Sequence, residues 1–453
     1  MTAISQKPIA GQMPKMLGVA LAGALVLSAC TENEAILPGV REGIRSVLEN
    51  PGSDPADAGV PENQSRAIAL GAAQANANWA QSPGSPQFRT AHPALSAAPQ
   101  PIWSASIGAG DSRRHRITAA PVVDAGRVFT LDAQSQVTAT STAGATLWSR
   151  DIKPVSDDDT RATGGGIAVA NGTVYVSLGY GSLVALDAES GAEKWRQQLD
   201  ATGSGTPTVL GDLVYVTAGD NTGWAVNTSN GRVAWQIGAS TDINNVLGAP
   251  APAVANDLVL FGFGSGELQA VFRRGGLRRW DASVLGQRPG RALSNVGDIT
   301  GAPMISGDTV YVGNQSGRIL ALKLGSGERI WTAREGASGP VWPAGDSVFA
   351  ISDTNELLRL DASDGSRIWG VPLPNFVKER PRKRSEVVAN YGPIVAGGRV
   401  IVASNDGVIR SFDPTDGTLT NTVQLPGGAT TAPVVAGGTL YVVSSKGQLH
   451  AFR

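Results

Sequence analysis

A tryptophan that follows a glycine by four residues recurs along the chain from residue 144 onward. Each repeating unit also carries a short Val/Tyr-rich run, an Ala-x-Asp-like run and Gly-containing turns, and the segment ALDAESGAEKW at residues 185–195 shows the second half of the unit. The period is roughly 38 to 52 residues. Units of this length with four short strands are typical of a β-propeller, in which blades pack around a central channel. The recurring tryptophans are Trp148, Trp195, Trp235, Trp280, Trp331 and Trp369.

The two ends of the repeat array complement each other. Eight second strands can be counted, the first starting at Val128 and the last at Leu440, but the final unit stops at Arg453 after three strands. The stretch QPIWSASI at residues 100–107 has the character of a fourth strand and has no unit before it. Joining it to the C-terminal strands removes the free edges that an open array would leave. We therefore predict an all-β fold at residues 100–453, an eight-bladed β-propeller of four-stranded antiparallel blades whose last blade is closed by an N-terminal strand.

The tryptophans are predicted to hold the ring together rather than to bind a cofactor. Each indole would project from a fourth strand onto the neighbouring blade, and burying roughly 150–250 Å² of it would contribute at most about 4–6 kcal/mol. Within the motif, Gly191 would take a positive φ, and the Asp187 carboxylate would accept N–H groups of the turn. A cofactor needs one site, whereas this motif repeats, although Asn421 stands at the tryptophan position of the seventh unit. The residues with this structural role are Trp103, Trp148, Trp195, Trp235, Trp280, Trp331 and Trp369.

The first thirty residues have the pattern of an export signal. A positively charged start precedes an apolar run at residues 16–29, which is too short to span a bilayer comfortably. It ends in Leu-Ser-Ala-Cys, which resembles the bacterial lipobox, so we predict a signal peptide at residues 1–29 and lipidation of Cys30; an ordinary signal peptide with an incidental cysteine is the alternative. Thr31 stands where inner-membrane retention signals have Asp, which favours the outer membrane, facing the periplasm. Residues 30–99, rich in Pro, Gly, Ser and Ala, are predicted to be the lipidated cysteine and a tether.

Composition excludes several classes of function. A formal net charge of -1 supplies no basic field for nucleic acid. The chain has a single cysteine, which excludes a disulfide framework, and its three histidines are scattered. The Gly-rich stretch at residues 163–169 lacks the lysine of a phosphate loop. We therefore expect no catalytic residue, no cofactor and no metal site.

The repeats resemble those of quinoprotein alcohol and glucose dehydrogenases. Those alcohol dehydrogenases hold their quinone against a disulfide between adjacent cysteines, and this chain has no such pair. Together with the lipobox, the repeats resemble the BamB family, lipoproteins of the outer-membrane β-barrel assembly machinery. That resemblance implies a non-catalytic scaffold that binds the periplasmic POTRA domains of the barrel protein BamA and assists unfolded outer-membrane proteins. The alternatives are a quinone-dependent dehydrogenase and a propeller lipoprotein that binds another envelope partner.

Two inter-blade loops resemble the partner-binding segments of that family. In NNVLGAPAP, residues 244–252, three residues stand at the Leu, Leu and Arg positions of the family's Leu-x-Leu-Arg-Gly pattern. RALSNVGDITGAP, residues 291–303, is similar to the family's Arg-Leu-Ser-Asp-Val-Asp segment. Ordinary blade connections are the alternative for both loops. The partner-binding residues implied by the resemblance are Asn244, Val246, Leu247, Arg291, Asn295 and Asp298.

Two basic clusters have no role in this scheme. RRGGLRR, residues 273–279, falls in a turn between a third and a fourth strand, and KERPRKR, residues 378–384, falls in the connection to the seventh blade. Each is either a solvated loop or a contact for an acidic partner surface or anionic head groups, and sensitivity to salt would separate the two.

Overall fold

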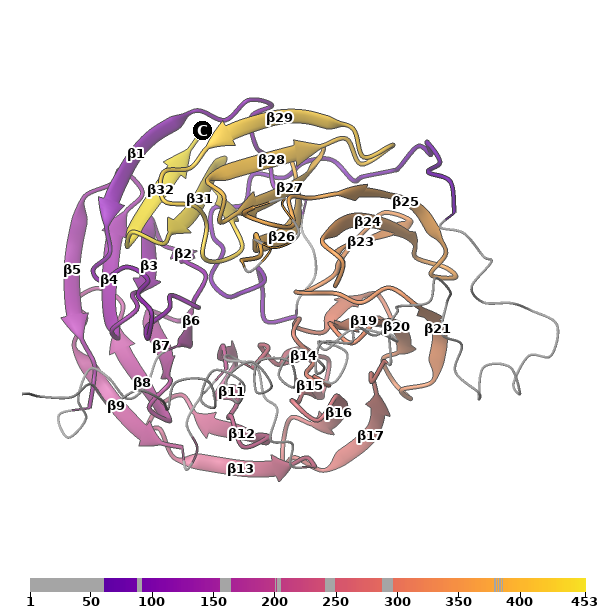
Figure 1. The fold of residues 1–453 in the computed structure, drawn as a ribbon. Helices are drawn as coiled ribbons and strands as arrows, with labels where there is room; N and C mark the ends of the chain where they lie inside the picture. Colours follow the sequence, from indigo (N-terminus) through magenta and orange to yellow (C-terminus); the bar gives the residue numbers. More distant parts are fainter. Residues whose placement is uncertain are drawn as a thin grey trace, which may run out of the picture. The chain divides into compact units, whose positions relative to one another are not determined.

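The computed structural model describes residues 61–87, 92–154, 164–199, 201, 205–240, 249–286, 296–378, 380, 382, 384 and 386–453. Within them the chain forms eight antiparallel sheets of four strands each, arranged as blades around a central channel (Figure 1). This confirms the predicted fold class. The predicted signal peptide and Cys30 lie outside the described residues.

The strands of each blade follow one another from the channel outward. Blades 1 and 2 contain β2 (Val122–Asp124), β3 (Arg127–Leu131), β4 (Gln136–Ser141), β5 (Thr146–Asp151), β6 (Gly165–Ala170), β7 (Thr173–Leu178), β8 (Ser182–Asp187) and β9 (Glu193–Gln198). Blades 3 and 4 contain β10 (Thr208–Leu210), β11 (Leu213–Thr217), β12 (Thr222–Asn227), β13 (Val233–Gly238), β14 (Ala253–Ala255), β15 (Leu258–Gly262), β16 (Glu267–Phe272) and β17 (Arg278–Ser283).

The second half of the ring repeats the arrangement. Blades 5 and 6 contain β18 (Met304–Ser306), β19 (Thr309–Asn314), β20 (Arg318–Lys323), β21 (Arg329–Ala333), β22 (Trp342–Ala344), β23 (Ser347–Ile351), β24 (Glu356–Asp361) and β25 (Arg367–Pro372). Blades 7 and 8 contain β26 (Asn390–Ala396), β27 (Arg399–Ser404), β28 (Val408–Phe412), β29 (Leu419–Gln424), β30 (Val434–Ala436), β31 (Thr439–Ser444), β32 (Gln448–Phe452) and β1 (Pro101–Ser106).

Both ends of the chain build blade 8, as predicted. Its strand order is β1-β32-β31-β30, and Ser104 of β1 lies opposite His450 of β32 in an antiparallel pair. Beyond the strands, Gln100 and Arg453 donate backbone hydrogen bonds to each other's carbonyl oxygens at 2.7 and 2.9 Å. The ring is therefore closed by hydrogen bonds between residues that are far apart in sequence.

Burial explains why inner and outer strands differ in sequence. The inner strands are covered by neighbouring blades on both faces, so every residue of β7 is buried and the strand contains a continuous apolar run. The outermost strands have one covered face, and β9 accordingly alternates exposed and partly buried residues. Hydrophobic packing between blades is thus the source of the repeat pattern.

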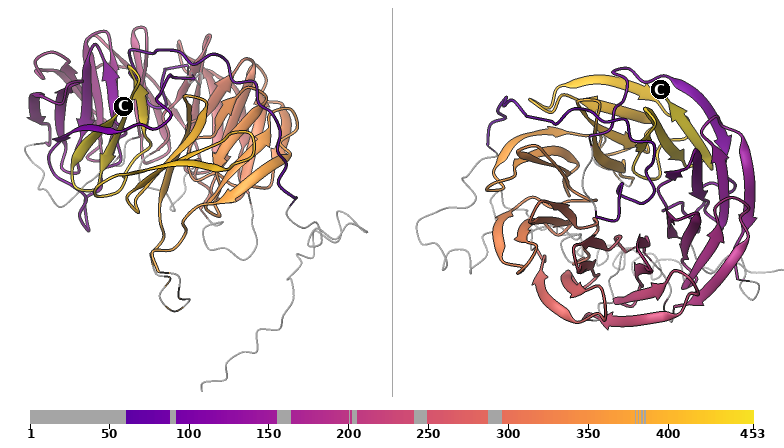
Figure 2. Two further views of the ribbon diagram at one scale, coloured as in Figure 1. Left: turned by 90° about the horizontal axis from the view of Figure 1, so that it is seen from above. Right: turned by 180° about the vertical axis from the view of Figure 1, so that it is seen from behind.

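The strand connections divide the ring into two faces. Because successive strands are antiparallel, the turns between first and second strands and between third and fourth strands lie at one end, here called the turn face. The second-to-third turns and the connections between blades lie at the other end, here called the connection face. Figure 2 shows the ring from the side, with the connection between β25 and β26 projecting from one side and the segment before β1 on the other.

Residues 61–87 and 92–100, here called the N-terminal arm, pack on turns of the turn face and along the innermost strands of the ring. Trp79 exchanges backbone hydrogen bonds with Val123 of β2 at 2.7 and 2.8 Å, and the carbonyl oxygens of Ala80 and Pro86 accept hydrogen bonds from the first strands of blades 2 and 4. The buried side-chain amide of Gln81 donates to Val209 O and accepts from Val209 N–H, both at 2.9 Å, in the first strand of blade 3. The described part of the predicted tether is therefore fixed to the ring, because its polar groups find partners on the inner strands.

The arm also crosses the channel. Trp79 stacks on Trp342 of β22 with ring centroids 6.0 Å apart and an interplanar angle of 12°, and both indoles are buried. β2 belongs to blade 1 and β22 to blade 6, with blades 7 and 8 between them, and Figure 2 shows the arm passing over the centre in the view from behind. Among the described residues there is no helix with the length and apolar character that crossing a membrane requires.

Candidate functional site

The structural tryptophans join each blade to the next. The Nε1 of Trp195 donates to the carbonyl oxygen of Thr228 in the following blade at 2.8 Å, and Trp280 contacts Leu324 in the same way. The remaining five indoles make the equivalent bond at 2.9–3.2 Å; they are Trp103, Trp148, Trp235, Trp331 and Trp369.

The glycine of each motif is required by the tryptophan of the preceding blade. A Cβ atom on Gly231 would lie 2.6 Å from Cε3 of Trp195, and one on Gly327 would lie 2.6 Å from Cε3 of Trp280. The sequence predicts a positive φ for Gly191 of this motif, which the structure shows, but the contact of the motif glycine with the indole of the preceding blade was not predicted. The fixed interval between glycine and tryptophan is the signal that could have revealed it. Asn421 takes the tryptophan position of blade 7, next to blade 8, whose outer strands β32 and β1 come from distant parts of the sequence.

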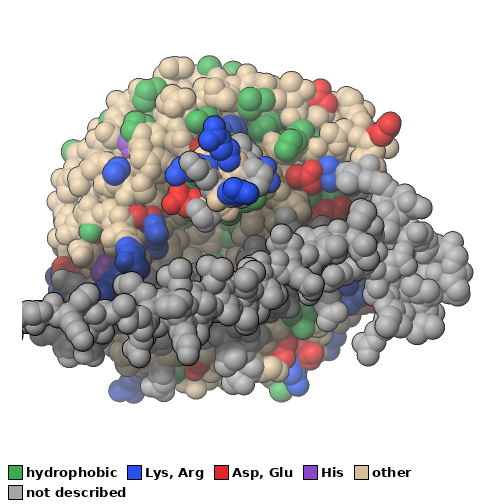
Figure 3. Space-filling model, in the orientation of Figure 1, with side chains coloured by type: hydrophobic (Ala, Val, Ile, Leu, Met, Phe, Trp, Pro, Cys, Tyr) green, Lys and Arg blue, Asp and Glu red, His purple; other side chains and the backbone are tan. Residues whose placement is uncertain are grey.

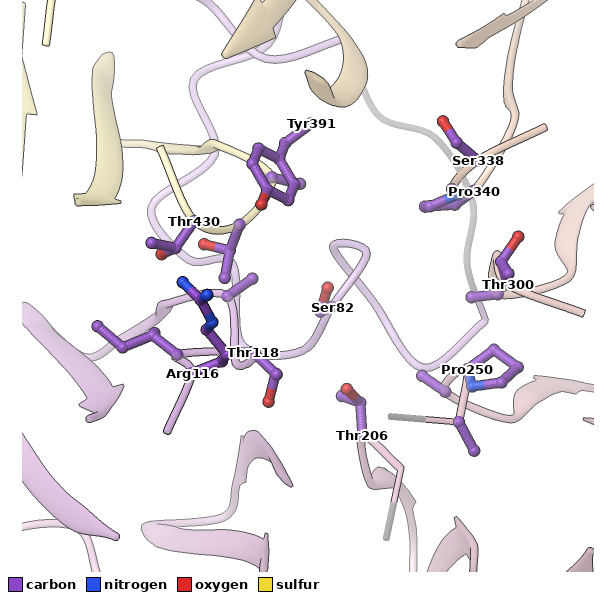
Figure 4. A pocket seen from close by; sticks show the side chains of 18 of the residues that line it. Ser82, Arg116, Thr118, Thr206, Pro250, Thr300, Ser338, Pro340, Tyr391 and Thr430 are labelled. Atoms are coloured by element: carbon purple, nitrogen blue, oxygen red, sulfur yellow. The ribbon is translucent and has the colours of Figure 1, made fainter. Parts of the chain in front are cut away.

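A cavity of about 860 Å³ lies at the channel mouth on the connection face (Figure 4). Most blades contribute the residues just before their first strand, and the arm contributes Ser82 and Pro83. The labelled lining residues from the blades are Arg116, Thr118, Thr206, Pro250, Thr300, Ser338, Pro340, Tyr391 and Thr430.

The threonine hydroxyls of this lining connect neighbouring segments of the ring. Thr118 donates to Gly165 O at 2.9 Å, Thr300 to Ala337 O at 3.0 Å, and Thr430 to Val443 O at 3.2 Å. A hydroxyl becomes a nucleophile when a neighbouring base takes its proton, and these hydroxyls donate to backbone carbonyls instead. Their geometry serves the fold rather than a reaction.

Charged groups at the mouth are held by local contacts. The Nη1 of Arg116 lies 3.3 Å from Oδ2 of Asp111, whose Oδ1 accepts the N–H of Ile117 at 2.8 Å. Burial raises the pKa of the Tyr391 phenol, and the nearby charge of Asp111 adds to that rise. Asp298, from the second predicted partner-binding loop, lines the cavity and is 5% exposed.

The other predicted partner-binding residues, Asn244, Val246, Leu247, Arg291 and Asn295, lie outside the described residues.

Described residues nevertheless fix where both loops join the ring. Ala249 and Pro250 precede β14, Asp298 and Thr300 precede β18, and all four line the cavity. The two loops therefore meet the ring on the connection face, on either side of blade 4.

A quinone with its metal ion does not fit the described residues. Such a group needs several carboxylate or amide ligands that converge on a cation. The described part of the chain contains no cluster of three His, Cys, Asp or Glu side chains with that geometry. We derive no chemical step through a quinone.

Comparison with known proteins assigns the family. The family profile described as "Outer membrane protein assembly factor BamB" matches residues 133–371 and 378–453, which is well over half of the chain. The chain belongs to the BamB family. BamB of Shewanella oneidensis is 25% identical over 244 residues, 52% of this chain and 61% of that protein, and BamB of Yersinia pestis is 25% identical over 53% and 62%. The chain thus matches about three fifths of the length of these curated BamB relatives.

Solved structures share the BamB fold. The crystal structure of BamB from Moraxella catarrhalis superposes with a TM-score of 0.65 at 18% identity, covering 79% of this chain and all of that one. A europium-containing methanol dehydrogenase superposes with a TM-score of 0.63 at 14% identity, covering 83% and 98%. At these identities the likeness concerns the fold alone, so it does not decide between an assembly factor and an enzyme.

Proposed function

We propose that this chain is a non-catalytic scaffold lipoprotein of the outer membrane, anchored through Cys30 and facing the periplasm, that binds the POTRA domains of a BamA-like protein. The observation that carries the proposal is that the described ends of the two predicted loops, Ala249 with Pro250 and Asp298 with Thr300, line one cavity of a ring of the BamB family. A closed propeller is rigid, so the points at which both loops join it are held at fixed positions on one face, where a partner can dock.

Surface charge on the connection face supports a docking role. Lys378, Arg380, Arg382 and Arg384 are exposed in the connection between β25 and β26, and the Arg384 guanidinium lies 4.9 Å above the Phe376 ring. Figure 3 shows Lys and Arg side chains gathered near the middle of this face. Such a group favours contact with an acidic partner surface and makes binding weaker at high salt.

The proposal includes a way to hold unfolded clients. The outermost strand of each blade leaves backbone groups unpaired on one side, and extended segments can add to such an edge. At blade 6 the chain itself does this, because Gln64 N–H donates to Ile368 O at 2.8 Å and the Asn63 amide exchanges two hydrogen bonds with Gly370. The arm thereby supports the idea that an outer edge accepts an extended polypeptide.

The test is capture of a purified POTRA fragment. Leu247→Glu places a charge in the first loop and is expected to weaken capture at least about tenfold, the effect of losing one apolar anchor. Leu277→Glu is the matched control, because Leu277 is 71% exposed in a turn on the opposite face. Titration of the fragment against both variants by calorimetry, with thermal unfolding as the check on folding, gives the result. Wild-type affinity in Leu247→Glu would contradict the docking assignment.

A further inference from the structure

A second cavity, of about 820 Å³, lies on the turn face between blades 4 and 5. Its walls are the turns around Asp257 and Asp308, the side chains of Phe272 and Arg279, and the turn at residues 323–326. Asp257, Asp308 and Arg279 are exposed. We call this cavity the 4/5 groove.

The 4/5 groove has an occupied counterpart between blades 6 and 7. In the repeat, Asp257 corresponds to Asp346, because each precedes the second strand of its blade. By the same alignment of strands and turns, Phe272, Arg279 and Gly325 of the 4/5 groove correspond to Asp361, Ile368 and Thr415.

At the counterpart site the occupant is an extended segment of the N-terminal arm. Gln64 N–H donates to Ile368 O at 2.8 Å, and Arg66 N–H donates to Thr415 O at 3.1 Å. The Arg66 guanidinium pairs with Asp361 at 2.6 Å and with Asp346 at 3.1 Å. This kind of groove can thus hold an extended chain through two interactions: backbone hydrogen bonds, and one basic side chain that pairs with a turn carboxylate.

The arm leaves the 4/5 groove open. In the described part of the chain, no hydrogen bond joins the arm to blade 5, whereas the arm is hydrogen-bonded to blade 4 and to blade 6. The Nε of Arg279 donates a long hydrogen bond of 3.3 Å to Gly325 O across the groove. Because Arg279 is exposed, its side chain can move into solvent, and a peptide N–H can take its place on Gly325 O. Lys323 is paired with Glu328 at 2.7 Å, at the edge of the same turn.

We propose that the 4/5 groove binds an extended segment of a partner protein, with a basic side chain of that segment on Asp257 and one of its backbone N–H groups on Gly325 O. The chain's own arm in the equivalent groove supplies the precedent, and Asp257 stands at the position of Asp346. This site lies on the face opposite the POTRA-docking loops and goes beyond the proposed function.

The probe is the fluorescein-labelled peptide PENQSRAIAL, residues 61–70 of this chain, titrated into the full chain and followed by fluorescence polarisation. Binding is expected, and the same peptide with R66E should bind about tenfold more weakly because a charge-assisted contact becomes a repulsion. Absence of binding up to about 1 mM overturns the proposal.

Two variants test the location. Gly325→Trp fills the groove, and its Cβ enters open space, so folding is expected to be unchanged by thermal unfolding. Asp257→Lys removes the carboxylate, and Asp212→Lys, at the same exposed turn position of blade 3, is the matched control. Both groove variants should weaken binding at least about tenfold and the control should not. Equal affinity in all three would place the peptide elsewhere and overturn the proposal.

The outcome is separate from that of the proposed function. Gly325→Trp is expected to capture the POTRA fragment as well as the wild type does, because the groove and the loops lie on opposite faces. Loss of POTRA capture in Leu247→Glu with peptide binding retained shows that the two sites act independently.

Discussion

The junction of blades 6 and 7 and the junction of blades 4 and 5 are built from the same repeat, yet only the first holds the chain's own arm. The third strand of six blades has alanine opposite the fourth-strand tryptophan, whereas blade 6 has Arg359. The alanines are Ala139, Ala185, Ala225, Ala270, Ala321 and Ala451. This departure from the repeat occurs at the junction that holds the arm.

Arg359 shows how that departure works. The side chain is fully buried, and its Nη2 donates to Ala67 O at 3.2 Å while its Nη1 donates to Pro414 O at 2.9 Å and to Arg66 O. Its Nε donates to Ser347 Oγ at 2.8 Å. A guanidinium is a planar set of five donors that stays charged, and here the arm and the neighbouring turn supply the acceptors. The arm is part of the polar interior of the ring at this point.

The largest effect is expected for Arg359→Ala, which removes this difference between the two junctions. Alanine is the repeat residue, so the blade itself accepts it, but several carbonyl oxygens and Asp346 lose their partner. We expect a loss of about 3–5 kcal/mol in the free energy of unfolding and faster proteolysis within the arm. Chemical denaturation and limited proteolysis measure both. Arg279→Ala, an exposed arginine of the other groove, is the control, and equal effects in both variants would contradict the assignment.

A smaller loss in the free energy of unfolding is expected for Gly327→Ala, which tests the junction of blades 4 and 5, where the arm is not bound. The added Cβ would meet the Trp280 indole at 2.6 Å and would take a φ of +71°. Overpacking and left-handed strain together are expected to cost about 2–3 kcal/mol. Gly307→Ala in the same blade has a similar φ but open space around its Cβ, so it isolates the strain. Equal unfolding free energies for the two variants would show that the Trp280 indole can move away from the added Cβ without loss of stability.

The smallest effect is a pH dependence of arm attachment. Burial alone would raise the pKa of Asp361, but hydrogen bonds from Ser363 and from Arg66 outweigh it and lower the pKa to about 2. Because this folded-state pKa lies below the usual value of 3.8, the contribution is complete above pH 4 and is lost as the pH falls through about 2. Arm release, followed by proteolysis or by the fluorescence of Trp79, should increase over that range.

Asp187 provides the matched comparison for the pH experiment. It occupies the same repeat position in blade 2, and hydrogen bonds from Ser190 lower its pKa to about 2 as well, but among the described residues no hydrogen bond or ion pair joins it to the arm. Asp361→Asn should release the arm at neutral pH and abolish the acid step, whereas Asp187→Asn should leave arm release unchanged. An acid step that persists in Asp361→Asn would show that another group controls the arm.

The regular part of the molecule could be predicted from its sequence, whereas the course of the N-terminal arm, which interrupts the repeat, was not predicted. The glycine–tryptophan interval predicts the blades, and Trp103 with residues 100–107 predicts the closing strand, because these features repeat. The arm was expected to be a spacer, since its Pro- and Ser-rich composition has no strand period. Trp79 and Arg359 were the available signals: one is a large apolar residue in a polar stretch, and the other is a charge at an alanine position.

The candidate site, too, was predictable from the sequence only in part. The sequence alone placed two loops beside blade 4, because their ends abut predicted first strands. It could not show that the residues before most of the first strands form one cavity, or that Asp298 is largely buried in it, since these facts depend on how distant blades converge.

The sequence by itself determined the number of blades, the closure of the ring and the packing of each tryptophan on the next blade, because each of these follows from a local pattern whose repetition leaves one way to bury the apolar faces. Only the tertiary structure decided the course of the arm, the groove it fills and the groove it leaves open. Those choices rest on hydrogen bonds between residues about 300 positions apart, such as Arg66 and Asp361, and no local pattern encodes such a pairing.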